Sequence, residues 1–252
     1  MHKKAMYVLV ITSLFINFNL CAKSKTSKDT PGTAIFVMAE SNSIFVDTKI
    51  ITSQMDEINL NISIPQIKGL TDKEFERDLN KTFLEDAQKA KKTAIHTAKS
   101  YNKDMVKDGL TPIKFEYIST FSVIEAPKPY LVIGFLEYQY SGGAHGISYQ
   151  KYLNIRTTDN KVLALKDLFK ENVDYKELIN TEIKNQIQAR SIKGEYFFPG
   201  AQGFTTIKDD QEYYINSSGD IVIIFNIYEI APYAAGLVEF SIPAEKLASV
   251  LK

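Results

Sequence analysis

Residues 57–67 alternate between apolar and polar side chains. Four apolar residues recur at every second position: Ile58, Leu60, Ile62 and Ile64. This spacing of two is typical of a strand that buries one face, and it predicts a strand over 57–67. The β-branched and aromatic stretch at 43–52 predicts another strand just before it.

The spacing then changes to three and four residues, which is the period of a helix. The apolar positions form one stripe: Phe75, Leu79, Phe83, Ala87, Ala90, Ala94 and Ala98. Such a stripe predicts a helix over 71–101 that packs one side on a core. Thr71 with Glu74 three residues later predicts a capping box at its start. The stripe shrinks from aromatic to alanine, so the later turns either pack closely or are lightly buried.

Three more strands are predicted after this helix, over 113–123, 130–140 and 148–157. The middle one, YLVIGFLEYQY, is apolar on both faces, and this pattern places it in the interior of a sheet. Residues 126–129 contain two prolines and suit a hairpin connection between the first two strands. A glycine-rich turn leads into the third.

A second block repeats the order of strand, helix and strands. The elements predicted here are a strand at 162–165, a helix at 174–190 with Asp174 as its N-cap, strands at 212–216, 220–228 and 237–242, and a short helix at 243–251. Helices and strands stand in blocks and do not alternate strictly. We therefore predict an α+β fold of two small modules, each a mainly antiparallel sheet packed against one main helix. Their expected bounds are 44–158 and 159–252.

The N-terminus has the pattern of an export signal. A short basic head with Lys3 and Lys4 precedes sixteen uncharged, mostly apolar residues at 5–20. This arrangement predicts a secretory signal peptide over 1–20. The run is short for a membrane-spanning helix, although a retained membrane anchor or a buried strand has a similar pattern.

The only cysteine, Cys21, follows this run directly. A bacterial lipoprotein carries its lipidated cysteine at this place, so Cys21 is a candidate lipidation site. The residues at 18–20 are larger than that motif prefers, and cleavage after Ala22 would instead discard the cysteine. Residues 21–43 are expected to form a polar tether. The chain is thus expected outside the cytoplasm, in the periplasm or at the cell surface, with lipid anchoring at Cys21 as one possibility.

Charge and composition narrow the classes of partner. The chain has 30 basic and 30 acidic side chains, and removal of residues 1–20 would take away Lys3 and Lys4, giving 28 against 30, a charge of −2. Only 3 of the basic residues are Arg, which leaves few guanidinium groups to clamp phosphates. We therefore expect no nucleic-acid partner.

Motifs that carry catalysis are not found in the sequence. The three histidines, His2, His96 and His145, do not build a standard zinc site. No nucleophile elbow, Walker loop or dinucleotide-binding glycine motif occurs. The acidic pairs at 56–57 and 209–210 are adjacent in sequence and suit turns or strand edges better than a glycosidase site. We expect no cofactor, no metal and no catalytic residues.

Two segments nevertheless have unusual composition. In YQYSGGAHG, residues 138–146, the glycines permit a tight backbone path, and Tyr138, Tyr140 and His145 place polar-tipped rings beside it. This segment is either a binding site at the end of a strand or an irregular hairpin. The simplest catalytic reading would use His145 beside Ser141 as part of a hydrolase site.

The second segment is YEIAPYAAG, residues 228–236, between two predicted strands. Pro232 restricts the turn, the two alanines allow a close backbone approach, and Tyr228, Glu229 and Tyr233 are the candidate binding residues. The alternative is a rigid connection between strands without a ligand.

These two segments also carry a family resemblance. YSGGAHG after an aromatic strand, and DIVIIFNIYEIAPYAAGLVEFSIP later, resemble a pair of bacterial extracytoplasmic modules of unknown function. The first module is similar to the non-catalytic N-terminal domain of the peptidoglycan deacetylase PdaC. The second is similar to the C-terminal domain of the anti-sigma factor RsiV, which binds lysozyme. The resemblance covers about 44–252. The deacetylase domain of the one and the sigma-binding segment of the other are not expected in this chain.

Three functions remain open from the sequence. The first is a non-catalytic binding module for a protein or a peptidoglycan-type glycan in the cell envelope, with a lysozyme-like protein as one candidate partner. The second is a structural envelope lipoprotein without a specific ligand. The third is an envelope hydrolase that uses His145 and Glu229 in a site without a recognised motif.

Overall fold

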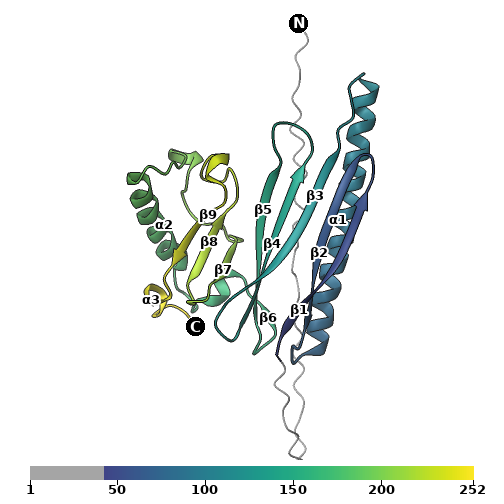
Figure 1. Cartoon of the computed structure of the whole chain (residues 1–252). Coiled ribbons are helices and arrows are strands. Elements are labelled where there is room, and N and C mark those ends of the chain that lie inside the picture. Colours follow the sequence, from purple (N-terminus) through teal and green to yellow (C-terminus); the bar gives the residue numbers. More distant parts are fainter. Residues whose placement is uncertain (1–42) are drawn as a thin grey trace, which may run out of the picture.

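A computed structural model describes residues 43–252, which form two sheets side by side (Figure 1). The large sheet consists of β1 (Phe45–Gln54), β2 (Ile58–Lys68), β3 (Phe115–Ile124), β4 (Tyr130–Tyr140), β5 (Ile147–Arg156) and β6 (Lys161–Val162), in that order. The small sheet consists of β7 (Tyr213–Ile215), β8 (Ile221–Phe225) and β9 (Val238–Ile242). All neighbouring strands are antiparallel except β2 and β3. Cys21, the predicted signal peptide and nearly all of the predicted tether lie outside the described residues.

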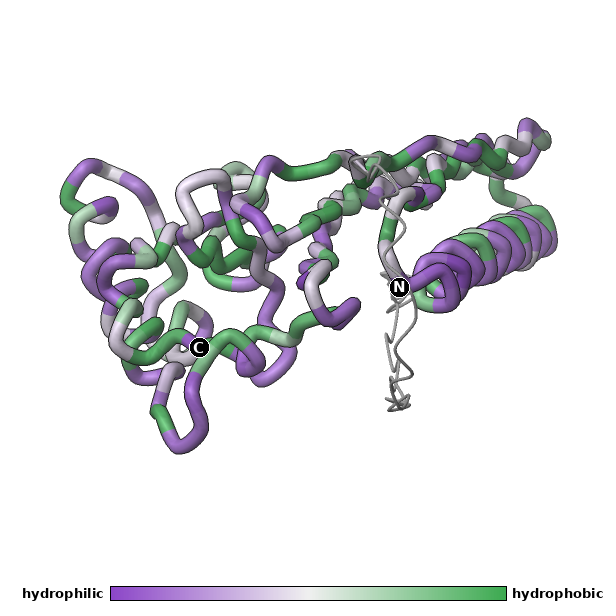
Figure 2. Tube along the Cα trace, turned by 90° about the horizontal axis from the view of Figure 1, so that it is seen from below, coloured by the Kyte–Doolittle hydropathy of each residue, from purple (hydrophilic) through white to green (hydrophobic). Residues whose placement is uncertain are grey.

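The long helix α1 (Lys73–Lys107) forms a layer against the large sheet (Figure 2). Its predicted apolar stripe is buried against the sheet. The predicted capping box at Thr71 is wrong: Asp72 is the N-cap, and its carboxylate accepts the backbone N–H groups of residues 74 and 75. The helix also continues past its predicted end at 101, because the buried amide of Asn102 is held by both backbone groups of Ile113.

The small sheet packs with α2 (Tyr175–Ile192), and the short helix α3 (Ala244–Leu247) follows β9. Asp174 caps α2 as predicted, since its carboxylate accepts the backbone N–H of Glu177. The strand predicted over 220–228 ends earlier, at Phe225, because a turn begins at Asn226. The predicted terminal helix is likewise shorter, with only 244–247 helical. The predicted α+β class, with each sheet packed against one main helix, is confirmed.

Strand β4 belongs to both hydrophobic cores. It lies between β3 and β5, as its two apolar faces predict. Leu131, Ile133 and Phe135 enter the core under α1, whereas Val132 on the opposite face enters the core of the small sheet. Because one strand contributes to both cores, the two modules share a wall and cannot be separated without exposing Val132.

Side chains join the edge of β5 to the second module. The backbone N–H groups of Gln150 and Tyr152 donate to the side chains of Asn226, at 2.7 Å, and Glu212, at 3.0 Å. In return, Asn154 of β5 donates to the carbonyl of Tyr213. These bonds satisfy edge groups that would otherwise be open to strand addition. The large sheet also extends to Val162, so it passes the predicted module boundary at 158.

Candidate binding site

The two unusual segments meet, although about ninety residues separate them in sequence. The ring of His145 stacks on that of Tyr233, with centroids 3.9 Å apart and an interplanar angle of 29°. The Tyr233 hydroxyl donates to the carbonyl of Gly146 at 3.1 Å. Tyr228 stands beside Tyr233, with centroids 5.8 Å apart. The β4–β5 turn and the β8–β9 connection therefore form one surface.

Tyr138 and Tyr140 at the end of β4 extend this surface. A Cβ on Gly146 would lie 2.4 Å from the ring of Tyr138, so only glycine permits the ring to cross the backbone there. The Tyr140 hydroxyl donates to the carbonyl of Gly143. Burial raises the pKa of Tyr138, and the nearby carboxylate of Glu116 adds to the rise. We call Tyr138, Tyr140, His145, Tyr228 and Tyr233 the aromatic cluster.

Tyr228 projects from a strained turn. Its φ is 70°, in the left-handed region that bulky residues rarely adopt, and its side chain is 51% exposed. Glu229 holds this turn, because its carboxylate accepts the backbone N–H of Asn226 at 2.5 Å and forms an ion pair with Lys208. The amide of Asn226 also bonds to both backbone groups of Gln150. Strain at Tyr228 is thus offset by contacts that tie the turn to β5.

The six candidate binding residues predicted from the sequence do not all have the same role in the structure. Five of the six form the aromatic cluster, whereas the carboxylate of Glu229 is occupied by the turn. His145 contacts the carbonyl of Gly146 and the ring of Tyr233. Within residues 43–252, no hydrogen bond joins His145 to Ser141 or Glu229, so the simplest hydrolase arrangement is not formed. In the same part of the chain, no three acidic, histidine or cysteine side chains converge as metal ligands.

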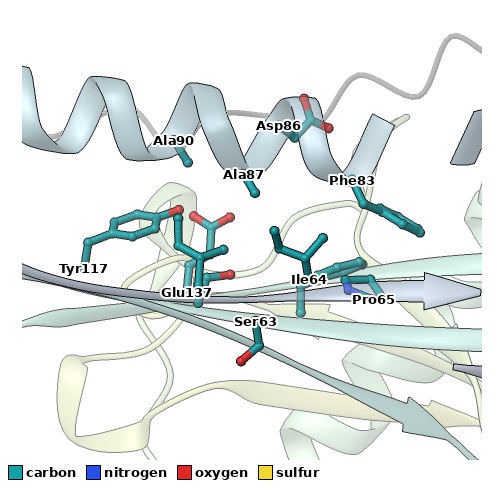
Figure 3. A pocket seen from close by; sticks show the side chains of 12 residues that line it. Ser63, Ile64, Pro65, Phe83, Asp86, Ala87, Ala90, Tyr117 and Glu137 are labelled. Carbon is teal, nitrogen blue, oxygen red and sulfur yellow. The ribbon is translucent and has the colours of Figure 1, made fainter. Parts of the chain in front are cut away.

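A separate small cavity with a mainly apolar lining lies between α1 and the large sheet (Figure 3). Its walls include Tyr117, Asp86 and Glu137, and the Tyr117 hydroxyl lies close enough to the Glu137 carboxylate to interact with it. Burial raises the pKa of Glu137, against the opposite effects of Lys151 and of Tyr117. The cavity measures about 40 Å³, which suits ordered water, while small-molecule sites need roughly 300 Å³ or more. The aromatic cluster is therefore the candidate site considered further.

No pattern in the sequence predicted this cavity or the residues that join the modules. Glu137 was the available signal, as a carboxylate within the otherwise apolar strand β4. Asn154, Glu212 and Asn226 gave no comparable signal, since single polar residues of this kind also occupy ordinary turns and strand edges. Only their partners across the junction show what they do.

Comparison with known protein families divides the chain into two segments. Residues 51–148 match the family model described as deacetylase PdaC. Residues 166–245 match a family described as a protein of unknown function, DUF3298. The chain therefore combines a PdaC-type segment with a DUF3298-type segment, and this pairing confirms the resemblance found in the sequence.

Two relatives from Bacillus subtilis share these segments. The anti-sigma-V factor RsiV is 27% identical over 206 residues, which cover 80% of this chain and 68% of RsiV. The peptidoglycan-N-acetylmuramic acid deacetylase PdaC is 24% identical over 139 residues, which cover 52% of this chain and 28% of PdaC. The similarity to the deacetylase thus spans only a minor part of that protein.

Two solved structures have the same fold. A DUF3298-family protein from Bacteroides fragilis aligns with a TM-score of 0.65 and 24% identity, over 84% of this chain and 94% of its own. A second, from Pseudomonas aeruginosa, aligns with a TM-score of 0.53 and 15% identity, over 84% and 95%. At these identities the likeness concerns the fold alone. Within residues 43–252, no helix is both long and apolar enough to cross a membrane.

Proposed function

We propose that this chain is a non-catalytic binding protein of the cell envelope that recognises a protein partner through the aromatic cluster. The observation that carries this proposal is the stack of His145 on Tyr233, which joins the two candidate segments into one surface. The similarity to an anti-sigma factor supports a protein partner, and the similarity to a peptidoglycan deacetylase supports a place in the envelope.

The chemistry of the cluster suits protein recognition. Tyrosine rings supply large contact areas together with hydroxyl groups, and they are frequent among the residues that dominate binding energy. Tyr233 and Tyr140 already use their hydroxyls to hold backbone carbonyls, so these rings are positioned before a partner arrives. A positioned ring loses less conformational freedom on binding than a free one. Tyr228 is the most exposed tyrosine of the group.

Replacement of Tyr228 with a smaller residue tests directly whether the aromatic cluster binds a partner. With lysozyme as the first protein probe, we expect the full chain to bind and Tyr228→Ala to weaken binding by about tenfold or more, because a central aromatic anchor is lost. Tyr228→Phe should retain most of the affinity, since the ring remains. Isothermal titration calorimetry measures both. Peptidoglycan fragments, titrated in parallel, separate a protein partner from a glycan.

Ile192→Ala provides the matched control, because Ile192 is an exposed apolar side chain at the end of α2, outside the cluster. It should leave the affinity unchanged. Equal losses in Tyr228→Ala and Ile192→Ala would contradict a site at the cluster. No heat of binding with either probe at about 100 μM would contradict both proposed partners.

Envelope attachment has its own test at Cys21. If the cysteine is lipidated, Cys21→Ala should move the protein from the membrane fraction to the soluble fraction, because the acyl chains supply the membrane affinity. Fractionation of cells that express each form, with detection of the protein in both fractions, measures this. An unchanged distribution would show that Cys21 is not the anchor.

A further inference from the structure

The outer edge of β1 is the least protected strand edge of the large sheet. Among residues 43–252, β1 pairs only with β2, whereas the opposite edge at β5 is closed by β6 and by side chains of the second module. Strand β1 also exposes large apolar side chains, with Phe45 at 50% and Ile50 at 61%. A long edge with apolar side chains is a template for pairing with another strand.

The geometry of a sheet restricts how two copies of β1 can pair. Opposite residues in an antiparallel pair lie on the same face, and side chains alternate between faces along each strand. A twofold axis perpendicular to the sheet keeps each residue on its own face. The axis must therefore pass midway between the two copies of one residue, which lie opposite each other. A register in which each residue lies opposite its own sequence neighbour is excluded, because neighbours lie on different faces.

Charge then selects one register. Strand β1 carries Asp47 and Lys49 two positions apart, on the same face, with Thr48 between them. An axis at 47 places Asp opposite Asp, and an axis at 49 places Lys opposite Lys, and both are unfavourable. An axis at Thr48 places Asp47 opposite Lys49 twice. The same register places Val46 opposite Ile50 twice on the other face.

We infer that the edge of β1 binds a second copy of this chain, in an antiparallel pair centred on Thr48. The pair joins two large sheets into one continuous sheet with two cross-strand ion pairs. Because β1 and β5 lie on opposite sides of the sheet, the interface lies away from the aromatic clusters, and the inference does not depend on the function proposed for them. Its test is also separate, since it measures self-association without a partner.

Single cysteines test the register. In the full chain with Cys21→Ser, Thr48→Cys places two thiols opposite each other, and mild oxidation should give a covalent dimer on a non-reducing gel. Thr52→Cys is the matched control, also exposed on β1. The two cysteines of this variant would lie about 27 Å apart, because eight residues separate each from its counterpart. Equal cross-linking of both variants, or none at Thr48→Cys, overturns the inference.

Charge reversal tests the ion pairs. Asp47 also forms an ion pair with Lys68 of its own chain, so Lys49→Asp is the cleaner variant. In analytical ultracentrifugation of the full chain, Lys49→Asp should weaken dimerisation about tenfold, since it replaces two attractions with two repulsions. The double variant Asp47→Lys/Lys49→Asp should restore part of the affinity, because it re-forms both cross-strand pairs but loses the pair with Lys68. Lys128→Asp, an exposed charge outside β1, should have no effect. A chain that stays monomeric at about 100 μM overturns the inference. This outcome includes the case in which another part of the same chain, before residue 43, pairs with the edge in place of a second copy.

Discussion

Replacement of Asn154 with alanine is expected to lower the free energy of unfolding by about 3 kcal/mol. Asn154 is 1% exposed, and its amide donates to the carbonyl of Tyr213 at 2.8 Å and accepts the backbone N–H of Ile215 at 3.2 Å. The variant loses both bonds and leaves two backbone groups of β7 buried without partners. Urea denaturation, followed by circular dichroism, measures the loss.

Asn61→Ala serves as the control for this prediction, because Asn61 is an exposed asparagine on β2. It should change the unfolding free energy by less than about 0.5 kcal/mol. Asn154→Asp is informative as well: it keeps an acceptor for Ile215 but loses the donor to Tyr213, so it should also destabilise. A loss below about 1 kcal/mol in Asn154→Ala would mean that these bonds contribute little to joining the modules.

The second large effect is expected in the pH dependence of stability and centres on Glu212. Burial raises the pKa of this carboxyl from its usual 4.5 to about 7, and Asp210 and Glu229 act in the same direction. The bond from the Tyr152 N–H and the charge of Lys151 oppose the rise. Between pH 4.5 and about 7, the carboxyl of Glu212 is therefore protonated in the folded state and ionised in the unfolded state.

This difference in proton binding decides whether a rise in pH stabilises or destabilises the folded state. Because the folded pKa is the higher one, the contribution of Glu212 is complete below pH 4.5 and is lost as the pH rises through about 7. Glu212→Gln keeps an oxygen that accepts the Tyr152 N–H but carries no charge. It should be more stable than the unchanged chain by about 2 to 3 kcal/mol at neutral to alkaline pH, and should show a flatter pH profile.

Urea unfolding of both forms at about pH 5 and about pH 8 measures the difference. The comparison isolates Glu212, because Asp86 and Glu137, whose pKa values burial also raises, are present in both forms. Glu171→Gln, at an exposed position, controls for the change in net charge. Parallel pH profiles for the unchanged chain and Glu212→Gln would show that Glu212 is not the group responsible.

Local patterns predicted most elements because local forces set them. The alternation in β2 and the stripe in α1 each follow from one buried face, and both are confirmed. One error, at the start of α1, occurred where two residues could fill the same role. Thr71 and Asp72 are both able to cap α1, and the backbone path into the helix decided for Asp72.

The sequence predicted which residues belong to the candidate site, but it did not predict how they are placed relative to one another. Glycine and tyrosine content marked both segments, but the contact of His145 with Tyr233 depends on how the two modules pack. The bond from the Asn226 backbone N–H to the Glu229 carboxylate is local to the turn, but composition did not indicate it either. The module boundary at 158 stays a prediction, and the large sheet includes residues on both sides of it, up to Val162.

The sequence by itself determined the α+β class, the central place of β4 and the unusual composition of the two segments. These properties depend on residue type and on spacing along the chain. Only the tertiary structure decided that Val132 joins the second core, that Asn154 and Asn226 link the modules, and that the aromatic cluster forms. Those contacts join residues far apart in sequence, and their energies depend on burial and on the position of a partner, which no local pattern contains.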